Sequence, residues 1–124
     1  MTWDGINKRR FPRIRYQCLI KLRKASSSQI VSTYTENVGI GGICVILGEK
    51  IDLFETVDIE LMLENGLESV ICGGKVMWAV GRCRPGGKNA AEYDIGIEFE
   101  HIKDRDLAVI RKIVDANLER TLRR

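Results

Sequence analysis

Apolar and polar residues alternate in several segments between positions 15 and 99 of this 124-residue chain. From position 15, the residues Tyr16, Cys18, Ile20 and Leu22 fall on one face and mostly charged residues on the other, a period of two that predicts a half-buried strand over 15–23. Similar patterns predict strands at 30–36, 43–47, 57–63, 69–80 and 93–99. Six strands with short links predict a mainly β fold, a closed six-stranded antiparallel β-barrel.

Residues that interrupt the alternation predict the turns. The run 25–28 ends the first strand and returns the chain into the second as a hairpin, which is expected to end at a turn beginning with Asn37. The pair Gly73-Gly74 predicts a bulge or bend within the long strand. Residues 82–91, which include Pro85-Gly86-Gly87, predict an exposed loop.

The end of the chain follows a helical period. After Asp104, a suitable N-cap, apolar residues recur at Leu107, Ile110, Val114 and Leu118, which predicts a C-terminal α-helix over 104–122. Its apolar stripe is expected to pack on the barrel or on another subunit, so both a monomer and a homodimer are open. Because no apolar run has the ~20 residues of a membrane span and no signal peptide is evident, we expect a cytoplasmic protein.

The charge is distributed unevenly. The net charge is +3, but residues 1–24 carry eight Lys or Arg against Asp4 alone, which is +7 and leaves −4 for the remainder. Residues 1–14 lack a sustained period and contain Gly5 and Pro12, which predicts a flexible basic N-terminal arm before a domain over 15–124. A basic N-terminal segment followed by an acidic remainder favours a local anion site over a general nucleic-acid surface.

Catalytic and metal signatures are weak. The four cysteines at 18, 44, 72 and 83 are spaced too widely for a zinc knuckle or a redox Cys-x-x-Cys motif, and core packing is the favoured interpretation. His101 is the only histidine, and no Ser or Cys is spaced as an activated nucleophile. Asp94, Glu98 and Glu100 could hold a metal, but a solvated strand face is the stronger interpretation. We expect neither an enzyme nor a cofactor.

Two motifs predict a binding site. Arg9-x-x-x-Arg13 lies in the basic cluster, and Asn37-x-Gly39-x-x-Gly42 follows one hairpin later. Arginine can grip phosphate oxygens or a guanine edge with two hydrogen bonds. Glycine backbone can approach a ligand closely and, at positive φ, turn its N–H groups toward an anion. Together the motifs favour a nucleotide.

The order of these motifs resembles that of the PilZ domain family, bacterial receptors for the second messenger cyclic di-GMP. Val76-Met77-Trp78, Ile95-Gly96-Ile97-Glu98-Phe99 and the helical tail follow in the family's order, so the resemblance spans nearly the whole chain. It implies a PilZ-like barrel whose cyclic di-GMP ligand is held by Arg9, Arg10, Arg13, Asn37, Gly39, Gly42 and, in a secondary place, Trp78. Trp78 seen alone is more typical of core or barrel rim.

One position departs from the family's pattern. Gly39 stands where the family has Ser, so a ligand-binding hydroxyl is missing, which costs about 0.5 to 1.5 kcal/mol of binding. One function left open is a receptor whose arm orders on the ligand and whose change is read by a protein effector of motility, secretion or polysaccharide synthesis. Another is a degenerate adaptor that binds no nucleotide and acts through protein contacts.

A third function ranks lower: a small barrel that binds RNA or single-stranded DNA through the basic arm. Such platforms stack bases on exposed aromatic side chains, and aromatic residues make up only 6% of this chain. We therefore expect no DNA or RNA partner.

Overall fold

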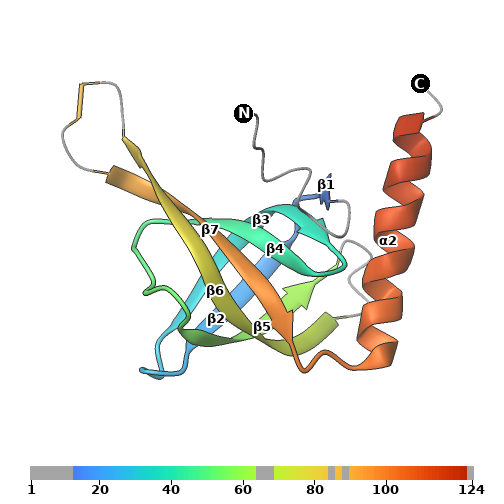
Figure 1. The fold of residues 1–124 in the computed structure, drawn as a ribbon, viewed down its shortest axis with the longest axis horizontal. Helices are drawn as coiled ribbons and strands as arrows, with labels where there is room; N and C mark the ends of the chain where they lie inside the picture. Colours follow the sequence, from blue (N-terminus) through green and yellow to red (C-terminus); the bar gives the residue numbers. More distant parts are fainter. Residues whose placement is uncertain (1–12, 64–68, 84–85, 88–89, 123–124) are drawn as a thin grey trace, which may run out of the picture.

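The computed structural model describes residues 13–63, 69–83, 86–87 and 90–122 (Figure 1). Within these residues the elements, in chain order, are β1 (Arg13–Arg15), β2 (Leu19–Lys24), β3 (Ile30–Gly39), β4 (Gly42–Leu47), β5 (Thr56–Met62), β6 (Ser69–Cys83), β7 (Ala90–Glu100) and α2 (Asp104–Leu122). No helix in the described part is both long and apolar enough to span a membrane.

The strands close on themselves. They follow the order β3-β2-β5-β6-β7-β4, and β4 pairs again with β3 to complete the ring. Every pairing is antiparallel, and β1 adds a short segment beside β3. The predicted closed six-stranded antiparallel barrel with a C-terminal helix is therefore confirmed.

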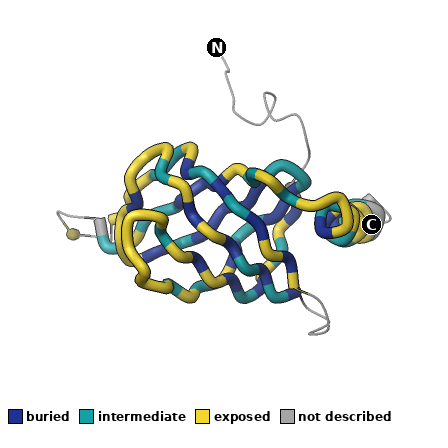
Figure 2. The backbone as a smooth tube through the Cα atoms, turned by 90° about the horizontal axis from the view of Figure 1, so that it is seen from below, coloured by how far each residue is buried: buried dark blue, intermediate teal, exposed yellow. Residues whose placement is uncertain are grey.

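Alternate residues of the strands fill the barrel, as the alternating colours of Figure 2 show. The largest side chains with almost no exposed surface are Ile20, Leu22, Ile43, Ile51, Ile59, Leu61, Ile95, Ile97 and Ile110. Helix α2 lies beside the barrel, where it contacts β1 and β3 (Figure 1). Ile110 and Val114 of its predicted stripe are buried within the chain itself, because an apolar stripe lowers its free energy by leaving water.

The first predicted strand is divided in two. The sequence predicts one strand over 15–23, but the chain leaves the ladder between β1 and β2, and both pieces then pair along the same side of β3. The buried Thr35 fills the gap: its hydroxyl accepts a hydrogen bond from Cys18 N–H (3.0 Å) and donates one to the Tyr16 carbonyl (2.7 Å). A side chain thus replaces a stretch of backbone pairing.

Strand β3 continues beyond the predicted turn. Asn37 does not end it, because β3 runs to Gly39 and the turn itself lies at residues 40–41. The β3–β4 register shifts between Thr35 and Asn37, which makes Glu36 the extra residue of a β-bulge. The bulge reverses the alternation, so Thr35 faces the interior and is 2% exposed, whereas Asn37 belongs to the outer face.

The bulge predicted at Gly73-Gly74 is wrong, and the loop predicted after β6 is shorter than expected. Gly73 and Gly74 keep a regular register with both neighbouring strands, and the irregularities fall at Met77 and between Arg82 and Cys83. Only the two ends of the predicted loop over 82–91 belong to strands, because β6 continues to Cys83 and β7 begins at Ala90. The two strands form a hairpin that projects from the barrel at the upper left of Figure 1.

Candidate functional site

Only some of the predicted site residues lie in the described part of the chain. Arg9 and Arg10 lie outside the described residues, as does most of the predicted arm. Arg13 is the first residue of β1, and only its backbone is described. The other predicted residues occupy three strands: Asn37 and Gly39 in β3, Gly42 in β4 and Trp78 in β6.

The pairing of β1 with β3 brings the two motifs together. Arg13 lies opposite Gly39, and Arg15 lies opposite Asn37. Backbones of paired strands are about 5 Å apart, although these residues are more than twenty positions apart in the sequence. The end of the arginine motif therefore adjoins the start of the glycine motif on the barrel.

Asn37 and Trp78 belong to one row on the outer face of the barrel. Asn37 pairs with Cys44 of β4, Cys44 pairs with Gly96 of β7, and Gly96 pairs with Trp78 of β6. The adjacent row passes through Val38, Ile43, Ile97 and Val76, all of which are buried in the core. Since successive residues of a strand point to opposite faces, Asn37, Cys44 and Gly96 belong to the outer face. The irregularity at Met77 lets Trp78, the partner of Gly96, join this outer row.

The indole of Trp78 covers Gly96. A Cβ atom at Gly96 would overlap the Nε1 and Cε2 atoms of the Trp78 ring, so the ring rests against bare backbone. Trp78 is half-buried in this position. The pair is a cross-strand contact in which a glycine provides room for an aromatic side chain.

The glycines of the second motif do not use a left-handed backbone. Among the described residues, positive φ occurs at Phe54, His101 and Gly86 and not in the glycine motif. The expectation that positive φ turns these N–H groups toward a ligand is therefore wrong. Gly42 has a packing reason of its own: a Cβ atom there would collide with the Ile97 carbonyl oxygen of β7.

An open groove of about 500 Å³ lies next to Asn37, at the break between β1 and β2. Its walls mix one cation, two carboxylates and several hydroxyls, and they comprise Arg15, Tyr16, Gln17, Thr33, Tyr34, Thr35, Glu36, Ile46 and Glu92. Such a surface suits a polar ligand, because it offers more hydrogen-bond donors and acceptors than a hydrophobic pocket does.

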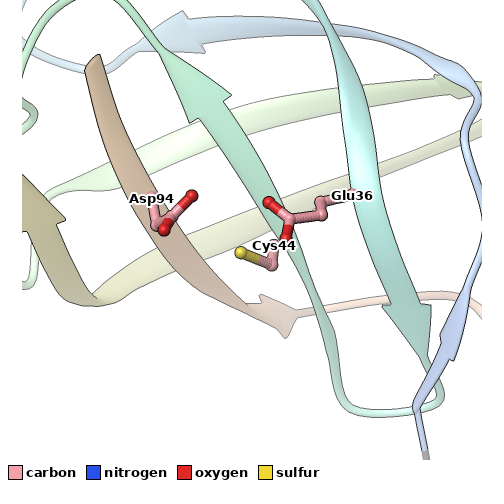
Figure 3. Close-up of side chains that lie close together, drawn as sticks. All are labelled: Glu36, Cys44 and Asp94. Carbon is pink, nitrogen blue, oxygen red and sulfur yellow. The ribbon is translucent and has the colours of Figure 1, made fainter. Parts of the chain in front are cut away.

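This outer face also carries a cluster of ionisable side chains that the sequence did not predict. Glu36 of β3, Cys44 of β4 and Asp94 of β7 point toward one another (Figure 3), and each supplies an oxygen or sulfur atom within 4.8 Å of the others. Arg82 of β6 donates a hydrogen bond from Nε to Asp94 Oδ2 (2.8 Å), which raises the pKa of the guanidinium. No spacing in the sequence signals this cluster, because its members come from separate strands.

Comparison with known proteins identifies the fold and the family. The family model described as PilZ domain matches residues 7–116. No curated protein sequence matches the chain significantly.

Several solved structures share the fold. The PilZ domain of Escherichia coli YcgR with c-di-GMP superposes with a TM-score of 0.72 at 10% identity, covering 92% of this chain and 94% of that one. The MrkH–c-di-GMP complex of K. pneumonia gives 0.74 at 17% identity, covering 94% and 55%. The Bacillus subtilis inhibitor of motility MotI/DgrA gives 0.73 at 16% identity, covering 94% and 52%. This chain spans about half the length of MrkH and MotI. Because the family model covers most of the sequence and the barrel has the same fold, the chain belongs to the PilZ domain family.

Proposed function

We propose that this protein is a cyclic di-GMP receptor that converts occupancy by the second messenger into a conformational change read by a protein effector. Membership in the PilZ domain family supports this function, as does the presence of c-di-GMP in the YcgR and MrkH structures. The observation that carries it is the β1–β3 register, which sets Arg13 opposite Gly39 and so joins the arginine motif to the glycine motif.

The chemistry of the motifs suits this ligand. Cyclic di-GMP carries two phosphates and two guanines, and the guanidinium groups of Arg9 and Arg13 can bind phosphate oxygens or guanine O6 and N7 with paired hydrogen bonds. Arg10 adds a further cation, and the Asn37 amide can pair with a guanine edge. The missing hydroxyl at Gly39 removes one hydrogen bond, which weakens binding about three- to tenfold.

The signal in this proposal is the ordering of the arm. A bound dianion neutralises the cations that repel one another along residues 8–15, and the arm closes over the ligand against the barrel. Ordering a segment lowers the affinity but creates two states that a partner can distinguish. The function needs no covalent step and no resident cofactor, and it is suited to the cytoplasm, where we expect the effector.

Calorimetric titration of the purified chain with cyclic di-GMP tests the proposal. We expect low-micromolar or tighter binding that neither cyclic GMP nor GTP displaces and that Arg13→Ala abolishes. Arg23→Ala is the matched control, because Arg23 is an exposed arginine that pairs with Asp58 (2.6 Å) and adjoins neither motif. Absence of binding by the unmodified protein up to about 1 mM, where binding is worth only ~4 kcal/mol, would refute the receptor function.

A second function, an adaptor that no longer binds nucleotide, is favoured by Gly39 alone. Gly39→Ser distinguishes the two functions, because restoring the hydroxyl should tighten cyclic di-GMP binding about three- to tenfold in a receptor. If neither the natural chain nor Gly39→Ser binds cyclic di-GMP, the adaptor is the better function, and its protein partner becomes the target of a pull-down.

A further inference from the structure

The bulge in β3 creates the cluster of Glu36, Cys44 and Asp94. Because Glu36 is the additional residue between Thr35 and Asn37, it adds a carboxylate to the outer face beside Cys44, the β4 partner of Asn37. Asp94 approaches from β7, where it pairs with the residue two positions after Cys44. Bulges often reorient a side chain in this way near functional sites.

Two carboxylate oxygens of the cluster lack a hydrogen-bond partner. Glu36 Oε2 and Asp94 Oδ1 are shielded from solvent and, within the described structure, form no hydrogen bond, although both side chains are partly exposed at other atoms. A shielded carboxylate oxygen without a partner is costly, and its usual explanation is a bound water or ion.

Arg82 neutralises the negative charge of the Glu36 and Asp94 carboxylates only in part. It forms a hydrogen bond with Asp94 Oδ2, but its Nη2 atom is 3.6 Å from Glu36 Oε2, which is too long for a hydrogen bond. Among the described residues, no other Lys or Arg forms an ion pair with Glu36 or Asp94. Two carboxylates therefore share one guanidinium, and a negative charge is left over.

We propose that Glu36, Cys44 and Asp94 form a binding site for a divalent metal ion that accepts thiolate, with zinc the best fit. Cys44 is 4% exposed and forms no disulfide, so its sulfur can serve as a ligand in a shielded position. Thiolate ligation favours zinc over magnesium and calcium, which prefer oxygen alone. Three protein ligands leave the fourth tetrahedral position for water or another small ligand.

Geometry and charge agree with this assignment. Ligand atoms around tetrahedral zinc are about 3.3 to 3.7 Å apart, so the three atoms, now within 4.8 Å of one another, need to move inward by roughly an ångström. With Cys44 as thiolate, three negative charges face Arg82 and a divalent ion, and the total charge is zero. The site does not depend on nucleotide binding.

Cobalt(II) titration of the reduced full-length protein tests the site, because a cobalt–thiolate bond gives a charge-transfer band in the near ultraviolet. We expect a band that saturates at one equivalent and is abolished when zinc is added. Cys44→Ser should remove the band, and Cys83→Ser, which changes an exposed cysteine on the projecting hairpin, should keep it. Glu36→Gln should retain the band but weaken cobalt affinity at least tenfold.

The controls separate a lost ligand from a lost fold. Circular dichroism must show the same β-sheet spectrum for each variant, and if Cys44→Ser fails to fold, the affinity of Glu36→Gln for cobalt decides the question. A band that persists in Cys44→Ser, a Glu36→Gln affinity equal to that of the natural chain, or no saturable band at all would overturn the proposal. The last result would assign the unpaired oxygens to a water or a shared proton.

Discussion

The pairing of Trp78 with Gly96 makes a quantitative prediction, which the substitution Gly96→Ala tests. Gly96 is buried in β7, and an added Cβ atom would overlap the indole that covers it. Gly96 has no left-handed φ, so alanine meets no backbone strain there. The change in the free energy of unfolding therefore measures the cost of displacing one aromatic ring.

The expected magnitude combines two opposing terms. Replacing a glycine by alanine at a compatible φ stabilises a protein by about 0.4 to 1 kcal/mol, because the unfolded chain loses freedom. Overpacking a well-packed contact costs about 1 to 3 kcal/mol. Gly96→Ala should therefore lower the free energy of unfolding by about 0.5 to 2.5 kcal/mol, whereas in a Trp78→Ala background it should raise it by about 0.5 kcal/mol.

A double-mutant cycle measured by urea denaturation and far-ultraviolet circular dichroism isolates the contact. Its interaction energy should equal the overpacking term, about 1 to 3 kcal/mol. Gly48→Ala is the control, because a Cβ atom there has no neighbour within 4 Å, so it should be neutral or slightly stabilising in both backgrounds. If Gly96→Ala has the same effect with and without Trp78, the glycine does not serve to seat the ring.

Three further substitutions or measurements follow from the structure. Thr35→Val removes the acceptor of the buried Cys18 N–H and should cost about 1 to 3 kcal/mol of unfolding free energy in urea, and a loss below about 0.5 kcal/mol would contradict the bridging role. Phe54 is 61% exposed at φ 65°, so Phe54→Gly should be about 1 kcal/mol more stable than Phe54→Ala in the same assay; equal stabilities would argue against backbone strain. Burial raises the pKa of Cys72 to about 11, so alkylation near pH 8 should be at least tenfold slower at Cys72 than at the exposed Cys83, and similar rates in the folded protein would count against the shift. Because unfolded Cys72 ionises from its ordinary pKa of 9.0, the stability due to this residue is present below pH 9 and is lost between about pH 9 and 11.

The candidate site was only partly visible in the sequence. The motifs that contain Asn37, Gly39 and Gly42 could be recognised because their residues are close together in the chain. The roles of the glycines could not be read in the same way, since Gly42 and Gly96 are required by neighbours from other strands, a carbonyl of Ile97 and the ring of Trp78. The ligand-binding role of these residues stays a prediction.

The class of fold could be predicted from the chain alone, because the period of two along the strands and the helical spacing after Asp104 are local properties that each segment carries independently. Which residues share a face depends instead on how the strands pair in the folded barrel. A single extra residue, Glu36, reverses the alternation of β3, and pairing between distant strands then brings Cys44 and Asp94 to its side. Register depends on contacts distributed around the closed barrel, so no segment specifies it alone.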